Sequence, residues 1–242
     1  MGSQAVNQPA YYARTGSTGR DLITLLHPPY TIWHLSYVAM GAAIAPRLDW
    51  VHLAGTILAF FFGMGIGAHA IDELHDRPLG TALSRGALLA LAVGGITAAA
   101  ALAVAGALII SPWVAVWGTA GVLLAIGYPL EVPGWLHTDP GFGLSWGGFP
   151  VLVGYWAQTQ TLSAPAVLLA AVATLLSMTQ RSLSTPARFV RRRTDEAGAS
   201  FELGTVSEHW SQDRLLDTWE TPLKLMGWAM PLLALALLTL HL

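Results

Sequence analysis

The residues best suited to do chemistry stand together in the stretch HAIDELHD, residues 69–76, where three carboxylates and two histidines fall within eight positions. On a helix, a spacing of three, four and seven residues would place four of these side chains on one face: His69, Asp72, Glu73 and Asp76. Carboxylates one turn apart suit Mg²⁺, which takes one or two carboxylates, water and substrate phosphates. Two other interpretations stay open: a solvated helix end whose acids pair with Arg77, and a transition-metal site that uses His69.

The composition indicates a membrane protein. Of the 242 residues 54% are hydrophobic and 11% are charged, whereas a soluble domain carries about a quarter charged residues. Ten tryptophans fit rings that anchor at membrane–water interfaces. Because cysteine is absent, disulfides, thiolate nucleophiles and cysteine metal sites are excluded. No basic run with interleaved aromatic residues occurs, so nucleic acid is not an expected partner.

Apolar segments recur along the chain at lengths close to the roughly 17 to 25 residues that a membrane span requires. They predict an all-α, polytopic helical bundle with seven spans, at about 30–46, 51–71, 86–110, 113–129, 144–159, 164–181 and 222–241. A polar segment, 1–24, precedes a single transmembrane domain, 25–242, in which 182–221 forms a cytoplasmic loop or lid.

The positive charges give this bundle an orientation. Eleven of the twelve Lys and Arg residues fall in the N-terminal segment, the 72–85 loop and the 181–224 region, and only Arg47 lies on the other side. By the positive-inside rule the N-terminus is cytoplasmic and the C-terminus is outside. We therefore expect an integral protein of a bacterial or archaeal cell membrane.

Three stretches, taken in order, resemble the UbiA superfamily of intramembrane prenyltransferases over about residues 25–180. They are HPPYTIWHLSYVAMGAAIAP, similar to the family's first span, DELHDRPLGTALSRGAL, similar to its aspartate motif, and YPLEVPGWLHTDPGFGLSWGGFPVLVGYWAQTQTLS, similar to its tyrosine-led loop and glycine-rich span. The resemblance implies that aspartates at the cytoplasmic helix ends hold Mg²⁺ and, through it, the diphosphate of an isoprenoid substrate. The isoprenoid tail would then lie inside the bundle, open to lipid.

Carried over residue by residue, the resemblance implies a candidate site. Asp72 and Asp76 match the paired aspartates and are the expected metal ligands and catalytic residues, with Glu73 and His69 as supporting ligands. Substrate contacts are expected from the loop tyrosine and from arginines, which pair bidentately with phosphate oxygens: Arg77, Arg85, Tyr128, Arg181 and Arg188.

The chain also departs from the family pattern. The 130–143 loop contains no Lys or Arg, and Arg191, Arg192 and Arg193 stand where a second acidic motif is expected. These arginines could bind diphosphate directly, or they could be positive-inside residues. Asp213 and Asp217 could form a displaced second metal site or an exposed amphipathic turn.

Two functions of different class follow from the sequence. The first is a membrane prenyltransferase that binds an isoprenoid diphosphate through Mg²⁺ and transfers or cyclises the prenyl group. The alternative is a non-catalytic relative that binds a lipid or pigment, or serves as an assembly subunit of a membrane complex. Since the family has nine spans and seven are predicted here, another copy of the chain or a partner membrane subunit could complete the bundle.

Overall fold

The computed structural model describes residues 8–14 and 16–242, so residues 1–7 and 15 of the predicted polar N-terminal segment lie outside the described residues. The described chain is mostly helical. Within it, four helical segments are long and apolar enough to cross a membrane: Trp50–His75, Arg85–Ile109, Ala164–Arg193 and Gln212–His241. These segments support the predicted all-α bundle of an integral membrane protein.

The elements follow one another in a simple order. The first half contains α1 (Thr18–Leu25), α2 (Pro28–Ala43), α3 (Trp50–Phe60), the π-helical η1 (Phe61–Ala68), α4 (His69–His75), α5 (Arg85–Ile109) and α6 (Val114–Gly127). The second half contains η2 (Gly134–His137), α7 (Asp139–Gly143), the π-helical η3 (Leu144–Gly148), α8 (Phe149–Thr159), α9 (Ala164–Arg193), β1 (Ala199–Leu203), β2 (Val206–Trp210), α10 (Gln212–Leu238) and η4 (Thr239–His241).

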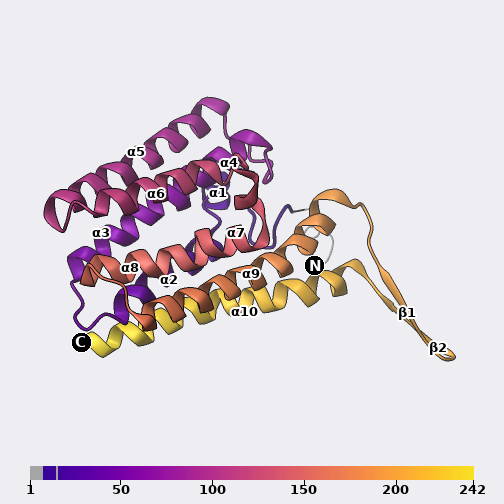
Figure 1. Cartoon of the computed structure of the whole chain (residues 1–242). Coiled ribbons are helices and arrows are strands. Elements are labelled where there is room, and N and C mark those ends of the chain that lie inside the picture. The colour runs from indigo at the N-terminus through magenta and orange to yellow at the C-terminus, as the bar shows by residue number, and fades with distance from the viewer. Residues whose placement is uncertain (1–7, 15) are drawn as a thin grey trace.

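The helices pack as two groups that share a long axis (Figure 1). In one group α2 lies against α8 and α10, and α9 lies against α10 and η3; in the other, α5 lies against η1 and α6. The end of α4, the start of α5, α7 and the junction between α9 and α10 all lie toward one end of the bundle (Figure 1). We call this end, which also carries α1, the polar end.

Local sequence explains where the helices start and how closely they approach. Serine and aspartate N-caps accept hydrogen bonds from first-turn backbone N–H groups of α1, α3, α5, α9 and α10. Gly41 of α2 and Gly154 of α8 permit a backbone crossing, because a Cβ on either would collide with the backbone carbonyl of Val151 or Val38. Small residues at such crossings are the usual device for helix packing in lipid.

The segment 182–221, predicted as a cytoplasmic loop or lid, contains regular secondary structure. Helix α9 continues to Arg193, a short arm carries the antiparallel pair β1 and β2, and α10 begins at Gln212. Hydropathy marks only the apolar part of a helix, whereas α9 continues because Ala187 and Val190 pack against Leu216 of α10. The hairpin projects away from the bundle (Figure 1).

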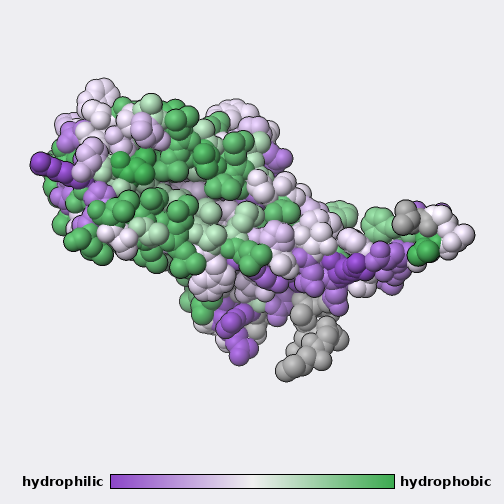
Figure 2. Space-filling model, turned by 90° about the horizontal axis from the view of Figure 1, so that it is seen from below, coloured by the Kyte–Doolittle hydropathy of each residue, from purple (hydrophilic) through white to green (hydrophobic). Residues whose placement is uncertain are grey.

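Surface hydropathy follows this division. Figure 2 shows hydrophobic side chains over much of the bundle and hydrophilic ones along the arm that leads to the hairpin. Exposed large apolar residues on α5, such as Leu108 (84% exposed), have no protein contact to bury them. A surface of this kind is stable against lipid tails rather than water.

The loop 77–84 is folded back onto the end of α4 by two charged side chains. Glu73 is fully buried and accepts hydrogen bonds from the backbone N–H groups of Leu79 (3.0 Å) and Thr81 (2.8 Å) and from the Thr81 hydroxyl (2.9 Å). Arg77 donates to the backbone carbonyls of Thr81 (2.9 Å) and Leu83 (3.1 Å). Within the charged stretch that begins at His69, Glu73 and Arg77 therefore have a structural role, since both hold the loop 77–84 in place.

Replacing Glu73 should destabilise the protein more than replacing its acidic neighbour. We expect Glu73→Ala to lower the free energy of unfolding by about 3 kcal/mol, because it leaves buried donors without acceptors. Asp76→Asn, at an exposed position, should change it by less than about 0.5 kcal/mol. Denaturant unfolding of both variants in the same detergent measures this, and equal effects would contradict the structural role of Glu73.

Candidate functional site

The candidate site is built on one face of α9 at the polar end. Arg181, Thr185, Arg188 and Arg192 follow one another at spacings of three and four residues and therefore share one side of the helix. Arg191 lies on another side and forms a bidentate pair with buried Glu220 of α10, with Nε–Oε1 at 2.5 Å and Nη2–Oε2 at 2.9 Å. Neighbouring arginines of the predicted basic segment thus have different roles.

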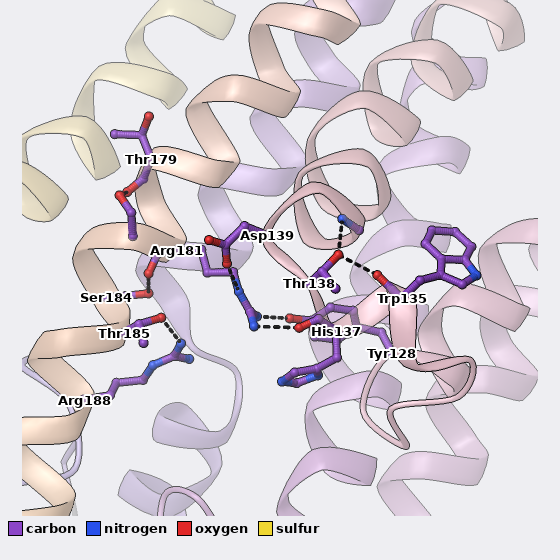
Figure 3. Close-up of polar contacts among 12 residues, drawn as sticks. Tyr128, Trp135, His137, Thr138, Asp139, Thr179, Arg181, Ser184, Thr185 and Arg188 are labelled. Carbon is purple, nitrogen blue, oxygen red and sulfur yellow. Dashed lines mark hydrogen bonds and ion pairs between the residues drawn. The ribbon is translucent and has the colours of Figure 1, made fainter.

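Arg181 ties α9 to the loop between α6 and α7. Its guanidinium donates to the Asp139 carboxylate (2.7 Å), to the Tyr128 hydroxyl (2.6 Å) and to the His137 backbone carbonyl (2.8 Å), as Figure 3 shows. Arg181 and Tyr128, both predicted as substrate contacts, are therefore brought together by a direct bond. Because three groups of the loop take up its donors, Arg181 is placed to hold the loop.

Arg188 and Arg192 lie about two and three turns beyond Arg181, and each has a neutral hydrogen-bond partner among the described residues. Arg188 has a long contact of 3.4 Å with the Thr185 hydroxyl, visible in Figure 3, and Arg192 donates to the Pro9 carbonyl at 3.0 Å. Among the described residues, neither guanidinium is within ion-pair distance of a carboxylate. Both are half-buried, so their mutual repulsion is less screened than at an open surface. An anion between them would remove that repulsion.

The ends of α2 and α4 complete the surroundings of this arginine pair. Asp72, which is half-buried, lies in the electrostatic field of Arg188 and Arg192. One turn before Asp72, the ring of His69 stacks on that of His27 with the centroids 4.3 Å apart. Tyr12 and Tyr30 lie in the field of the same two arginines. We call these seven residues the basic mouth: Tyr12, His27, Tyr30, His69, Asp72, Arg188 and Arg192.

His27 and Tyr12 are joined in the mouth by a hydrogen bond of 2.5 Å between the Tyr12 hydroxyl and His27 Nδ1. Burial lowers the pKa of His27 well below its usual value, and the positive field of the nearby arginines lowers it further. Burial also raises the pKa of the Tyr12 hydroxyl. At neutral pH the imidazole is therefore uncharged and the phenol keeps its proton, so the two groups can share one neutral bond.

An apolar cavity of about 230 Å³ lies between α3–η1, α5, α6 and η3–α8. His52 and Ile110 line it toward the end of the bundle opposite the mouth, and Met64 and Trp146 line it nearer the mouth. His52 and Met64 are about 18 Å apart along the helix at about 1.5 Å per residue, so the cavity is elongated. Its shape and lining suit a flexible hydrocarbon chain.

Trp146 lines the cavity, and a side chain of α2 binds its backbone carbonyl. Pro150 has no N–H to donate to the carbonyl four residues earlier, which is that of Trp146. His34 Nδ1 of α2 takes this role at 2.7 Å. The Trp146 ring meets Tyr128 edge to face at 5.5 Å, and Tyr128 lies in the field of Arg188 and Asp72. Through Trp146 and Tyr128, an aromatic contact therefore leads from the cavity lining toward the charged groups of the mouth.

The predicted metal ligands are not gathered into one cluster. Glu73 is occupied by the loop 77–84, Asp76 is exposed beyond the end of α4, and His69 Nδ1 donates to the Gly65 carbonyl at 3.1 Å. In the part of the chain that the structure describes, no group of three or more His, Cys, Asp or Glu side chains could hold a metal ion. Asp72 lies in the field of Arg188 and Arg192, and a single protein carboxylate is compatible with a Mg²⁺ held mainly by water and substrate phosphate.

The other predicted residues lie outside the mouth. Arg77 is turned to its own loop, and Arg85, at the start of α5, is exposed. Asp213 and Asp217 are exposed on α10, and neither is among the charged groups whose field acts on Asp72. Nothing in the structure adds to the expectation of a second metal site on α10.

Three residues of the mouth were not predicted from the sequence: Tyr12, His27 and Tyr30. The signal available was the aromatic pair Tyr11-Tyr12 in an otherwise polar segment and the His-Pro-Pro-Tyr start of the first span. Spacing alone could not join them, because Tyr12 reaches His27 only through the fold of the N-terminal segment.

Two arginines of α9 should respond in opposite ways to the same substitution. Arg181→Gln should lower the free energy of unfolding by about 2 kcal/mol, since it frees the loop and leaves its acceptors unpaired. Arg188→Gln should leave it unchanged or raise it by a few tenths, because it removes repulsion from Arg192. Ligand-free thermal unfolding in detergent provides the comparison, and the reverse order would contradict these assignments.

Lowering the pH should destabilise the folded protein through protonation of His27. Its folded-state pKa lies below the unfolded value of about 6.5, so the unfolded chain binds more protons and stability falls as the pH drops. The melting temperature should therefore decrease from about pH 7.5 to about pH 5.5. His27→Asn keeps a residue that tolerates the φ of 46° at this position and should reduce the slope. An identical slope in the two proteins would show that His27 does not contribute.

Comparisons of the chain with protein-family models, with curated protein sequences and with solved structures found no match. The resemblance to the UbiA superfamily therefore stays a prediction from the sequence, and the function must be argued from the site itself.

Proposed function

We propose that this protein binds an isoprenoid diphosphate at the basic mouth and transfers or cyclises its prenyl group inside the membrane bundle. The observation that carries the proposal is the combination of two features that the contact between Trp146 and Tyr128 links. One is a pair of arginines, Arg188 and Arg192, with no carboxylate partner among the described residues, and the other is an elongated apolar cavity that Trp146 lines. A molecule with a multiply charged anionic head and a long hydrocarbon tail matches both.

Arg188 and Arg192 would bind the diphosphate. Guanidinium groups donate in a planar fork that fits phosphate oxygens bidentately, and each gains more there than from its present neutral partner. A divalent or trivalent headgroup would also cancel the repulsion between the two arginines, which a single carboxylate such as Asp72 cannot do.

Asp72 is the chain's own candidate for a metal contact. We propose that Mg²⁺ binds together with the diphosphate, with Asp72 as its protein ligand, and neutralises charge on the departing pyrophosphate. Glu73 would act one step away, by holding the loop at the end of α4 and thereby the position of Asp72.

The aromatic pair of Trp146 and Tyr128 would serve the reacting carbon. In prenyl transfer the bond between the allylic carbon and the diphosphate oxygen breaks, and the electron pair leaves with pyrophosphate. The allylic cation is then captured by a nucleophile, which loses a proton. The faces of Trp146 and Tyr128 can stabilise such a cation, and the apolar cavity excludes water that would quench it.

The same proposal includes the topology predicted from the sequence. We propose that α2, α6 and the continuous α7–η3–α8 segment cross the membrane in addition to the four longer segments, giving seven spans. The mouth then faces the cytoplasm, because eleven of the twelve Lys and Arg residues lie on this side in the predicted orientation, and the positive-inside rule assigns that side to the cytoplasm. A second copy or a partner subunit could cover the remaining open side.

A non-catalytic role as an isoprenoid-binding protein is the second candidate. The observation in its favour is that no group of three or more potential metal ligands exists among the described residues, so a metal would depend on the substrate for most of its ligands. In that case the same mouth and cavity would bind the lipid without breaking its bond to diphosphate.

Turnover can be tested directly with purified protein in nanodiscs. We expect Mg²⁺-dependent release of pyrophosphate from geranylgeranyl diphosphate, supplied with a panel of aromatic and alcohol acceptors. Asp72→Asn should abolish release and Arg188→Gln should reduce it at least about tenfold, the loss expected for one charged contact of about 1.4 kcal/mol. Asp217→Asn, exposed on α10, is the matched control and should leave the rate unchanged.

The possible results separate the two candidates. Release that depends on Asp72 and Arg188 supports the enzyme. Tight binding of several prenyl diphosphates without release under any acceptor supports the non-catalytic role. Absence of binding contradicts both.

A further inference from the structure

The N-terminal segment lies directly across the basic mouth. We call residues 9–14 the N-terminal strap. Its first residue, Pro9, accepts a hydrogen bond from Arg192 Nε at 3.0 Å, and Tyr12 bonds to His27 at 2.5 Å. The strap therefore contacts two of the elements that a headgroup in the mouth would need, the end of α9 and the start of α2.

The strap is seated by specific contacts along its length. Ala10 and Ala13 are buried, at 6% and 2% exposed. The Thr24 hydroxyl of α1 accepts from the Arg14 backbone N–H (2.7 Å) and donates to the Arg14 carbonyl (2.8 Å). Such a two-way bond fixes both the position and the direction of the chain at the edge of the mouth.

Aromatic rings of the strap pack against one another and against Tyr30 of the mouth. Tyr12 meets Tyr30 edge to face at 5.5 Å and Tyr11 at 5.2 Å. Lys224 of α10 lies over the Tyr11 ring at 5.3 Å. Among the described residues the buried Tyr11 hydroxyl has no hydrogen-bond partner, and a strap with such an unsatisfied group is easier to displace than a fully bonded one.

These contacts place a neutral carbonyl and two phenols where an anion would be held more strongly. A phosphate carries a charge opposite to that of the guanidinium and can accept two parallel hydrogen bonds from it, whereas a backbone carbonyl accepts from it without a charge of its own. Arg192 currently donates to the Pro9 carbonyl, which carries no charge. A diphosphate that reaches the mouth therefore competes favourably with the strap for this arginine.

We infer that the N-terminal strap is an occluding segment of the mouth, and that a diphosphate headgroup opens it by replacing the Pro9 carbonyl on Arg192. The inference rests on the proposed function, since it takes a prenyl diphosphate as the ligand. The closed strap shields the arginine pair from other anions, and its opening is coupled to the arrival of a molecule with both a diphosphate and a hydrocarbon tail.

Hydrogen exchange of the full chain in nanodiscs tests this opening. In the closed strap the Ala13 N–H donates to the Ala10 carbonyl at 3.0 Å and the Arg14 N–H donates to Thr24, so both amides should be protected. Saturating geranylgeranyl diphosphate should increase exchange at these two amides at least tenfold, whereas geranylgeraniol, which has no diphosphate, should not. Slower exchange at these two amides would show that the strap closes over the ligand, and this would overturn the inference. Unchanged exchange when ligand binding has been confirmed would also overturn it.

A reversible disulfide between the strap and α1 provides a second test of the inference. Because the chain has no cysteine, the double variant Arg14→Cys, Thr24→Cys introduces a single possible disulfide between the strap and α1. The oxidised protein should bind geranylgeranyl diphosphate at least tenfold more weakly than the reduced protein, while the single variant Thr24→Cys should not respond to reductant. Equal binding by the disulfide-linked and reduced forms overturns the strap inference and leaves the proposed function standing. Failure of the wild-type protein to bind the diphosphate overturns both.

Discussion

The repulsion between Arg188 and Arg192 is the constraint on which the rest of the site depends. Two guanidinium groups one turn apart on a half-buried face are unfavourable unless something anionic or electron-rich stands near them. Asp72, the hydroxyls of Tyr12 and Tyr30 and the Pro9 carbonyl all surround the pair. None of them supplies enough negative charge to balance it. The structure thus retains an electrostatic cost that a multiply charged ligand would relieve.

Other charged groups at the polar end are satisfied by the protein itself, and the contrast identifies the site. Glu73 accepts hydrogen bonds from backbone N–H groups of its loop. Arg181 donates to the loop after α6, and Arg191 forms an ion pair with Glu220. In the apolar interior the carbonyl freed by Pro150 is bound by His34. Because unpaired polar groups are so costly next to lipid, the few that stay unpaired are the best candidates for function.

The sequence was sufficient for the class of structure, and for part of the site. Hydropathy predicted a helical membrane bundle, because apolar composition depends only on local sequence. The stretch from His69 to Asp76 stands out in the sequence by its charge, yet helical spacing could not tell that Glu73 binds the loop while Asp72 lies in the field of the arginines. That difference depends on where α4 ends and on how residues 77–84 fold back.

Long-range contacts account for what the sequence did not predict. By spacing, Arg181 and Arg188 are equally plausible phosphate contacts. In the fold, Tyr128 and Asp139 bind Arg181, which makes it a positioning residue, whereas Arg188 keeps its guanidinium available for a ligand. The extension of α9 to Arg193 follows from packing against Leu216, which no hydropathy window detects. The strap could not be foreseen, since its contact with Arg192 joins positions more than 180 residues apart.

The central claim is that one ligand spans the mouth and the cavity, and photolabelling tests it most directly. A geranylgeranyl diphosphate analogue with a diazirine at the end of its tail would be cross-linked in nanodiscs and mapped by mass spectrometry. The account predicts labels on cavity residues of α3–η1 and α6, such as Gly55, Met64 and Trp117, that excess unlabelled diphosphate prevents and Arg188→Gln weakens. Labels confined to the lipid-facing surface of the bundle, unaffected by competitor or by the substitution, would contradict it.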